Sequence, residues 1–333
     1  MVRRLWLVEA EGGNPYRNLA LEEYLLFCVP KDTAVLYLWQ NENTVVIGQN
    51  QNPYAQCSMQ EVKKHGIQIA RRLSGGGTVY HDKGNLNFTF IGRRDCFSIE
   101  NNKEILLKAL QNCGIQAVLS GRNDLTVQGR KVSGNAFYER GEYCYHHGTL
   151  LVDSNLSIMA ELLKVDKNKW KDRGIDSVRS RVENLRLWKP ELTVTELKCR
   201  LEQSFCDFYR QAEAEKKCFP LEEGTAGGEE LGALYGKYCS SEWIFGKKIS
   251  CNYSVSRRFT WGEAEISLEI EGENIRDIRI CSDALETDIF AELENALRGT
   301  HFDRKSIASC MEHTGEAGKQ ITEDVKLLLT EEM

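Results

Sequence analysis

The clearest chemical signal in the sequence is a glycine-rich stretch, RRLSGGGTVYHD, which begins at Arg71. Three consecutive glycines at 75–77 lie between two runs of strand-forming residues. Glycine has no Cβ, so such a turn can present backbone N–H groups to an anion, and the guanidinium of Arg72 suits phosphate oxygens. The stretch therefore indicates a phosphate or acyl-phosphate site, although a hairpin with a flexible glycine turn explains the spacing equally well. Because G-K-[ST] and G-x-G-x-x-G are both missing, it is neither a P-loop nor a dinucleotide fingerprint.

A second cluster, GRNDLTVQGRKVSGNAFY, covers residues 121–138. Asn123 and Asp124 fall at a turn, where Asp124 could hold Mg²⁺ beside a polyphosphate, although a plain Asx-turn is the more common meaning of such a pair. Lys131 opens the next strand. Its ammonium could stabilise a developing anion, but a lone lysine on a strand is more often simply solvated.

Two further segments carry polar residues at suggestive spacing. HHGTLLVD, residues 146–153, contains a histidine pair and Gly148, which could pack closely against the glycine loop. A histidine here could act as a general base, but no Ser/His/Asp order accompanies it, and a metal site on the pair has little support. RGIDSVRSRVENL, residues 173–185, places three arginines and two serines where they could contact a nucleotide, or where they could form a solvated face.

The elements that must position these clusters follow from hydrophobic periodicity. The three strands predicted at 125–127, 131–138 and 143–152 resemble an antiparallel meander. The segment 220–236 is rich in Gly and Glu with little periodicity. The remaining predicted elements are strands at 5–8, 34–39, 44–48, 67–71 and 115–119, and helices at 18–28, 53–65, 99–113 (capped by Ser98) and 193–212.

The C-terminal part of the chain has a different pattern. Residues 253–280 alternate as strands do, and helical runs follow at 288–297 and 324–329. This pattern predicts a small separate α+β unit, joined near 246–251. The order of elements is not a strict βαβ series, so a doubly wound parallel sheet is not expected.

Composition narrows the class of protein. The 333 residues suggest one large and one smaller domain, and the net charge of −6 argues against a nucleic-acid partner. No apolar stretch is long enough for a membrane span or a signal peptide, so we expect a cytoplasmic protein without a membrane partner.

Twelve cysteines occur without a C-x-x-C pair, and we expect most of them to be small buried hydrophobic residues.

Taken together, these segments resemble the lipoate–protein ligase A family of the biotin/lipoate ligase superfamily. The resemblance covers nearly the whole chain and rests on the order and spacing of its motifs. These are RRLSGGGTVYHD, GNLNFTF, GRNDL, GRKVSGNA, HHGTLLVD and GIDSVRSRVENL, followed by WIFGK and FTWGEAEI in the C-terminal part.

The resemblance implies an α+β fold: a catalytic domain at 1–248 with a large mixed sheet of the class II aminoacyl-tRNA synthetase and biotin ligase type, and an accessory domain at 249–333. It implies Lys131 as the catalytic residue, touching the lipoyl carboxylate and the adenylate, while Asp124 stays the candidate Mg²⁺ ligand from its place at the turn. It also implies that residues 173–181 match a mobile loop closing over the adenylate. The resemblance implies nucleotide contacts for Arg72, for 77–80 and for Lys131. Together with the motif residues described above, the residues expected to bind ATP and lipoyl-AMP are Arg72, Ser74, Gly75, Gly76, Gly77, Thr78, Val79, Tyr80, His81, Asn123, Asp124, Lys131, His147, Gly148, Ser177 and Arg179.

The implied activity is the ATP- and Mg²⁺-dependent conversion of lipoate, or octanoate, to an acyl-adenylate, followed by transfer to a lysine. The acceptors would be the lipoyl domains of 2-oxoacid dehydrogenases or the glycine-cleavage H protein. Two alternatives stay open: an octanoyl- or lipoyltransferase that takes its acyl group from a carrier protein, and a non-catalytic lipoate-binding protein. Such transferases use a cysteine nucleophile, in some cases downstream of HHGTLLVD, and no cysteine lies between Cys144 and Cys199.

Overall fold

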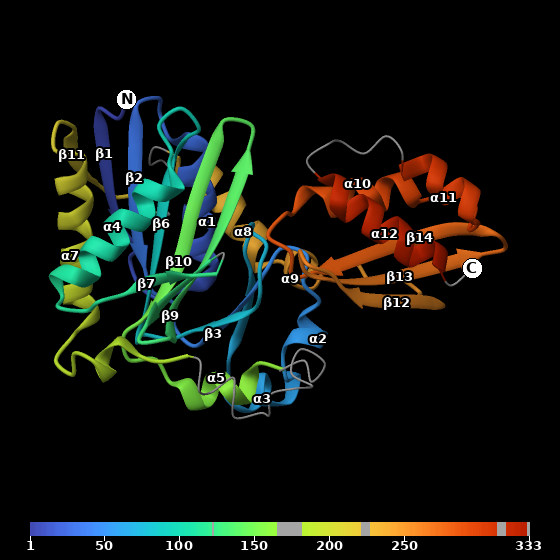
Figure 1. Cartoon of the computed structure of the whole chain (residues 1–333), viewed down its shortest axis with the longest axis horizontal. Coiled ribbons are helices and arrows are strands. Elements are labelled where there is room, and N and C mark those ends of the chain that lie inside the picture. Colours follow the sequence, from blue (N-terminus) through green and yellow to red (C-terminus); the bar gives the residue numbers. More distant parts are fainter. Residues whose placement is uncertain (122, 165–181, 221–226, 312–317, 332–333) are drawn as a thin grey trace. The chain divides into compact units, whose positions relative to one another are not determined.

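The computed structural model describes residues 1–121, 123–164, 182–220, 227–311 and 318–331. The chain forms two compact units, which are described separately (Figure 1). The first consists of Met1–Val46, Tyr54–Arg71 and Val79–Ile244, and the second of Ile47–Pro53, Arg72–Thr78 and Phe245–Met333. The division of function between 1–248 and 249–333 stays a prediction.

The first unit is built on an eight-stranded mixed sheet in the described part of the chain, with the order β11-β1-β2-β6-β10-β9-β8-β7. β1 is parallel to β2 and to β11, and the other neighbours are antiparallel, which confirms the α+β class and the predicted meander. The strands are β1 (Arg4–Glu9), β2 (Thr33–Trp39), β6 (Asn85–Arg93), β7 (Val118–Ser120), β8 (Asp124–Val127), β9 (Arg130–Arg140), β10 (Tyr143–Leu151) and β11 (Glu213–Lys217).

Helices cover both faces of this sheet. α4 (Ile99–Asn112) and α7 (Val194–Phe208) share a hydrophobic core with β2, β6 and β8, whereas α1 (Pro15–Cys28) packs on the opposite face and beside α8 (Gly228–Cys239). Ser98 and Thr193 accept N-terminal N–H groups of α4 and α7, from Asn101 and Glu196. Their hydroxyls satisfy N–H groups that have no partner within the helix, which is why the two helices begin where they do.

A second, three-stranded sheet has the order β4-β3-β5, formed by β4 (Gln68–Arg71), β3 (Thr44–Ile47) and β5 (Val79–His81). The predicted helix at 53–65 is wrong as one element, because it is split into α2 (Pro53–Gln56) and α3 (Met59–Lys64). Ser58 interrupts it by accepting the Glu61 N–H as a new N-cap, and Cys57 forms a bridge with Leu163. The short elements nearby are α5 (Leu156–Leu162) and the 3₁₀ turn η2 (Leu185–Leu187).

Two other predictions for this unit need correction. No element was predicted in the segment 220–236, whose periodicity is weak, yet α8 begins at Gly228 and buries Leu231. The strand predicted at 115–119 is shifted to Val118–Ser120, because Ile115 is buried in the core directly after α4. In both segments local periodicity is weak, and tertiary packing determines the secondary structure.

The second unit has its own core. β12 (Tyr253–Arg258), β13 (Glu263–Glu271) and β14 (Asn274–Ser282) form an antiparallel sheet, and three helices supply the rest of its hydrophobic cluster. This confirms a small C-terminal α+β fold. The helices are α10 (Asp288–Leu297), α11 (Arg304–Met311), which the periodicity missed, and α12 (Lys319–Glu331), and the chain enters the unit through α9 (Ser241–Phe245).

The cysteines differ from the expectation. All twelve lie in the described part and are free, but only Cys57, Cys113, Cys144 and Cys281 are buried. The idea that most of them serve as buried hydrophobic residues is therefore wrong. No helix in the described part of the chain is long and apolar enough to cross a membrane.

Candidate functional site

Lys131 and Asp124 form an ion pair on neighbouring strands of the large sheet. The Lys131 Nζ lies 2.7 Å from Asp124 Oδ1, and the two side chains are 37% and 29% exposed. β8 pairs with β9 so that Asp124 is opposite Gly134, and a register shift after Leu125 brings Lys131 opposite Thr126. A Cβ on Gly134 would lie 3.2 Å from the Lys131 Nζ, so glycine leaves space for the ammonium. The pair is thus fixed in position but accessible to a ligand.

The backbone of Lys131 is also held from the other side. It forms a parallel bridge with Val182, and its carbonyl accepts the Glu183 N–H at 2.9 Å. Glu183 also pairs with Arg130, at 3.0 Å between Nη1 and Oε2. The chain that follows the segment 173–181 therefore runs directly beside the strand that carries Lys131. The predicted site residues Ser177 and Arg179 lie outside the described residues.

His147 belongs to a buried hydrogen-bond network that the sequence did not reveal. Its Nδ1 lies 2.8 Å from Glu22 Oε1, and the same carboxylate oxygen accepts the Thr89 hydroxyl at 2.6 Å. Thr89 in turn accepts the Trp39 indole N–H at 3.1 Å. Glu22 is 2% exposed and His147 is 6% exposed. The available signal was strand alternation, which places Thr89 and His147 opposite each other on the face that α1 covers.

Gly148 has a packing role. A Cβ at this position would lie 2.6 Å from the Phe88 ring and 2.7 Å from the Gly134 carbonyl oxygen. The close approach at Gly148 is therefore to these two residues of the same sheet. The packing against the glycine loop stays a prediction. The glycine allows β9, β10 and β6 to come together behind the Lys131–Asp124 pair.

The glycine loop lies in the second unit, and its conformation is set by Arg72. The Arg72 Nη2 donates to the carbonyl oxygens of Gly75 at 2.7 Å and Gly77 at 2.8 Å, and its Nε donates to the Ser74 hydroxyl at 3.0 Å. The Gly76 N–H donates to the Ala284 carbonyl at 2.8 Å. The arginine predicted to bind the ligand thus also shapes the loop that would cradle it.

The three glycines have different structural needs. A Cβ on Gly75 would lie 2.1 Å from the Ala284 carbonyl oxygen, and Gly76 has a φ of +86°, which favours glycine. A Cβ on Gly77 meets nothing within 4 Å. The protein's own packing therefore requires glycine at 75 and 76 but not at 77.

The remaining predicted residues of the glycine motif belong to two different units. The Thr78 hydroxyl donates to Gln51 Oε1 at 2.8 Å, within the second unit. Val79, Tyr80 and His81 form β5 of the first unit. The Tyr80 hydroxyl donates to Asn43 Oδ1 at 3.0 Å, and burial raises the pKa of Tyr80 to about 12, so it is a neutral donor. His81 Nδ1 lies 3.1 Å from Asn41 Nδ2.

Comparison with known proteins assigns the family. Residues 14–206 match the lipoyl protein ligase A/B catalytic domain, and residues 248–328 match the C-terminus of bacterial lipoate protein ligases. A protein of Psychrobacter cryohalolentis named lipoate-protein ligase A is 34% identical over 326 residues, which make up 97% of this chain and 96% of the relative. The chain belongs to the lipoate–protein ligase family. The family expected from the ordered motifs is thereby confirmed.

Solved ligase structures are similar in fold. LipL1 of P. falciparum in complex with lipoate aligns with a TM-score of 0.83 and 26% identity, covering 97% of this chain and 98% of that one. A bipartite ligase from Thermoplasma acidophilum, studied with its E2 lipoyl domain, aligns with a TM-score of 0.64 and 28% identity. The alignment covers 75% of this chain and 99% of that one. A lipoate-protein ligase A bound with ATP aligns with a TM-score of 0.63 and 27% identity. The alignment covers 74% of this chain and 99% of that one.

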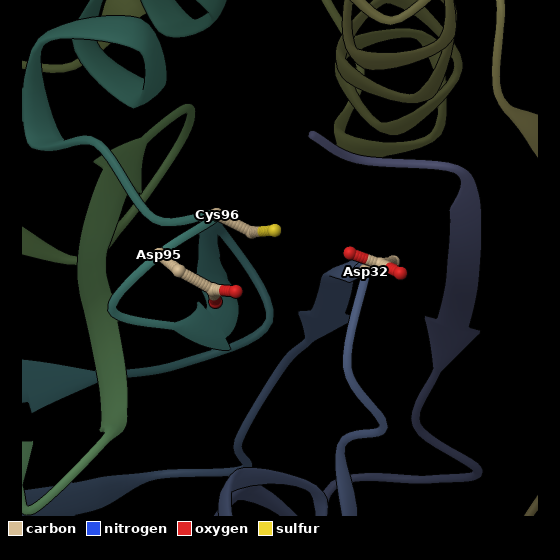
Figure 2. Close-up of side chains that lie close together, drawn as sticks. All are labelled: Asp32, Asp95 and Cys96. Atoms are coloured by element: carbon tan, nitrogen blue, oxygen red, sulfur yellow. The ribbon is translucent and has the colours of Figure 1, made fainter.

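Side chains that could hold a metal ion gather at two places in the described part of the chain. Two groups of three side chains bring ligand atoms within 4.8 Å of one another, and neither includes Asp124. Asp32, Asp95 and Cys96 converge where the chain enters β2 and leaves β6 (Figure 2). In the group of Glu61, His65 and Glu161, Lys64 already pairs with Glu61 at 2.7 Å. Asp124 would thus offer a metal one carboxylate, which suits Mg²⁺ when phosphate oxygens supply further ligands.

Proposed function

We propose that this chain is a lipoate–protein ligase that activates lipoate with ATP and transfers the lipoyl group to a lysine of an acceptor protein. The observation that carries the proposal is the half-exposed Lys131–Asp124 pair on a fold that matches ligases over nearly its full length. Related structures hold lipoate or ATP, the two substrates that the reaction requires.

In the first step, a carboxylate oxygen of lipoate attacks the α-phosphorus of ATP. A new O–P bond forms, the bond to pyrophosphate breaks, and lipoyl-AMP results. We assign to Lys131 the stabilisation of negative charge on the attacking carboxylate and on the phosphate oxygens. Asp124 holds the Lys131 ammonium in place, and its carboxylate could also contact Mg²⁺, which would neutralise phosphate charge when bound.

In the second step, the ε-amine of the acceptor lysine attacks the acyl carbon of lipoyl-AMP. An amide bond forms, the bond to AMP breaks, and the amine gives up a proton. The Lys131 ammonium again stabilises the oxyanion, and the glycine loop shaped by Arg72 would present backbone N–H groups to the adenylate phosphate. The nucleotide contacts assigned to Ser74–Thr78, Val79–His81, Asn123, His147 and Gly148 belong to this proposal.

We propose a lipoyl domain or a glycine-cleavage H protein as the acceptor, and the cytoplasm as the place of reaction. The related ligase of T. acidophilum acts with an E2 lipoyl domain, which supports the first acceptor. A carrier-dependent acyltransferase is disfavoured because no cysteine lies between Cys144 on β10 and Cys199 on α7. Octanoate remains the competing substrate to be tested beside lipoate.

The proposal is tested by pyrophosphate release. Purified protein is mixed with ATP and Mg²⁺, and pyrophosphate is measured with lipoate, with octanoate and with no acid. Release that requires lipoate supports a ligase. If acceptor modification required an acyl carrier protein and proceeded without ATP, the chain would be a transferase, and if neither reaction occurred, it would be a binding protein.

A further inference from the structure

A buried histidine lies behind the Lys131–Asp124 pair, on the opposite face of the sheet. His146 on β10 is 0% exposed, and its ring centroid lies 5.5, 5.9 and 4.7 Å from those of Phe88, Phe90 and Phe137. Phe88 and Phe90 belong to the core shared with α4 and α7. His146 is therefore packed into that core and is shielded from ligands on the α1 face.

The two charged residues project to the other face. Leu125 and Val132, their neighbours along β8 and β9, belong to the same core cluster as Phe88 and Phe90. Because side chains alternate along a strand, Asp124 and Lys131 point to the face that α1 covers. Any influence of His146 on their chemistry must pass through other residues of the sheet.

The hydrogen bonds fix which ring nitrogen of His146 carries its proton. His146 Nε2 lies 2.8 Å from Asn135 Oδ1, and Asn135 Nδ2 donates to the Asn123 carbonyl at 2.9 Å. Since an amide oxygen only accepts, Nε2 is the protonated nitrogen. His146 Nδ1 is buried without a partner among the described residues, as expected for the bare nitrogen of a neutral ring. Burial holds the pKa of His146 well below its ordinary value of 6.5, so the ring stays neutral.

Asn135, which accepts the His146 Nε2–H, is also hydrogen-bonded to Asn123 at the start of β8. Its backbone N–H donates to the Asn123 carbonyl at 2.8 Å, and the Asn123 side-chain amide donates back to the Asn135 carbonyl at 2.9 Å. With the Asn135 side-chain bond, three hydrogen bonds join these two residues. Asn123 directly precedes Asp124, and Asn135 directly follows Gly134, the register partner of Asp124. The clamp therefore ties β8 to β9 at the point where the ion pair projects.

We propose that His146 is a positioning residue of the ligase reaction. Its Nε2–H holds the Asn135 amide, the Asn135–Asn123 clamp holds β8 against β9, and this sets the geometry of Lys131 and Asp124. The inference rests on the proposed function in one respect, that Lys131 stabilises the reacting oxyanion. A displacement near 1 Å at such a group can cost up to about 100-fold in rate.

The test compares three variants at a temperature where all are folded. His146→Phe keeps a ring among the phenylalanines but removes the donor, and His146→Gln keeps a neutral N–H donor. Phe205→Leu is the matched control, because Phe205 is buried in the same core on α7, next to Phe90. Lipoate-dependent pyrophosphate release and transfer from pre-made lipoyl-AMP are measured for each.

We expect His146→Phe to lower kcat in both half-reactions by about 10- to 100-fold with little change in KM. His146→Gln should recover most of this loss, and Phe205→Leu should keep the original kcat. Equal kcat for His146→Phe and Phe205→Leu, in an otherwise active protein, would overturn the proposal. Absence of lipoate-dependent pyrophosphate release in the unsubstituted protein would instead refute the proposed function.

A second measurement does not depend on activity or on the folding of a variant. ¹⁵N spectra of the imidazole ring should show His146 as the neutral Nε2–H tautomer at neutral pH, with slow exchange of that proton. A proton on Nδ1, or a charged ring, would break the hydrogen bond to Asn135 on which the proposal depends.

Discussion

At the scale of single residues, the proposed chemistry depends on one ammonium group. Lys131 is oriented by Asp124 at 2.7 Å, and its strand is flanked by Glu183, whose N–H binds the Lys131 carbonyl. These contacts hold the lysine in one place, and its catalytic role stays a prediction. The pair shows how a cation can be fixed in position while its side chain stays accessible to substrate.

Replacing this lysine should remove a preorganised donor. Lys131→Ala is expected to lower the rate by about 10²–10³, or roughly 3–4 kcal/mol, without a comparable loss of folding stability. Lys131→Arg should not restore the full rate, because a planar guanidinium cannot replace a compact ammonium. Both half-reactions should be measured together with thermal unfolding. Rates near those of the original protein for Lys131→Ala would make the lysine an ordinary surface residue.

The buried His146 predicts how stability depends on pH. The folded pKa of His146 lies below the ordinary 6.5 because of burial first, and then through electrostatic interaction with His147 and Lys103. The unfolded chain therefore takes up a proton that the folded one does not. The stabilisation is complete above about pH 6.5 and is lost as pH falls below it. Urea unfolding at pH 7.5 and pH 5 measures how much free energy of unfolding is lost in acid. We expect a smaller loss for His146→Phe than for the original protein, and equal losses would contradict this explanation.

At the scale of elements, periodicity was informative where a strand or helix has one buried side. The meander β8–β9–β10, the capped helices α4 and α7 and the alternating strands β12–β14 were all predicted. The helix at 53–65 failed because Ser58 caps a new helix, and α8 was missed because its periodicity is weak. The Glu22–His147 contact joins residues 125 positions apart, which no local pattern reveals.

The glycine loop offers a prediction at this scale. Gly77→Val adds a Cβ that meets nothing within 4 Å in the protein, so it should weaken lipoate and ATP binding while leaving the unfolding temperature nearly unchanged. Gly76→Val should instead cost about 1–3 kcal/mol in stability, because its φ of +86° strains a residue with a Cβ. Calorimetric titration and thermal unfolding distinguish the two variants. Unchanged affinity in Gly77→Val would remove the loop from the site.

At the scale of the whole molecule, the chain combines a large mixed-sheet unit with a small α+β unit. The second unit also takes in the segments Ile47–Pro53 and Arg72–Thr78, which the sequence assigned to the first domain. No local signal could place the glycine loop with Ala284, because that contact spans more than 200 residues. The ordered motifs nevertheless identified the family, since their spacing reflects the whole fold.

The cysteines test the burial pattern across both units. Cys199, Cys239 and Cys251 are exposed and should react first with iodoacetamide at pH 8. Cys218 is exposed too, but its hydrogen bond to Glu11 raises its pKa and should slow it. Cys57 should stay unmodified until unfolding, because burial raises its pKa to about 11. Peptide mass spectrometry over time gives the order in which the cysteines are alkylated. Early labelling of Cys57 would contradict this structure.

The central claim is that this chain forms lipoyl-AMP and passes the lipoyl group to a lysine. The most direct measurement is the intact mass of an acceptor lipoyl domain after incubation with the protein, ATP, Mg²⁺ and lipoate. The account predicts a gain of one lipoyl group that requires both ATP and lipoate and is lost when the acceptor lysine is replaced by arginine. An unchanged acceptor mass, with lipoyl domain and H protein both tested, would contradict it.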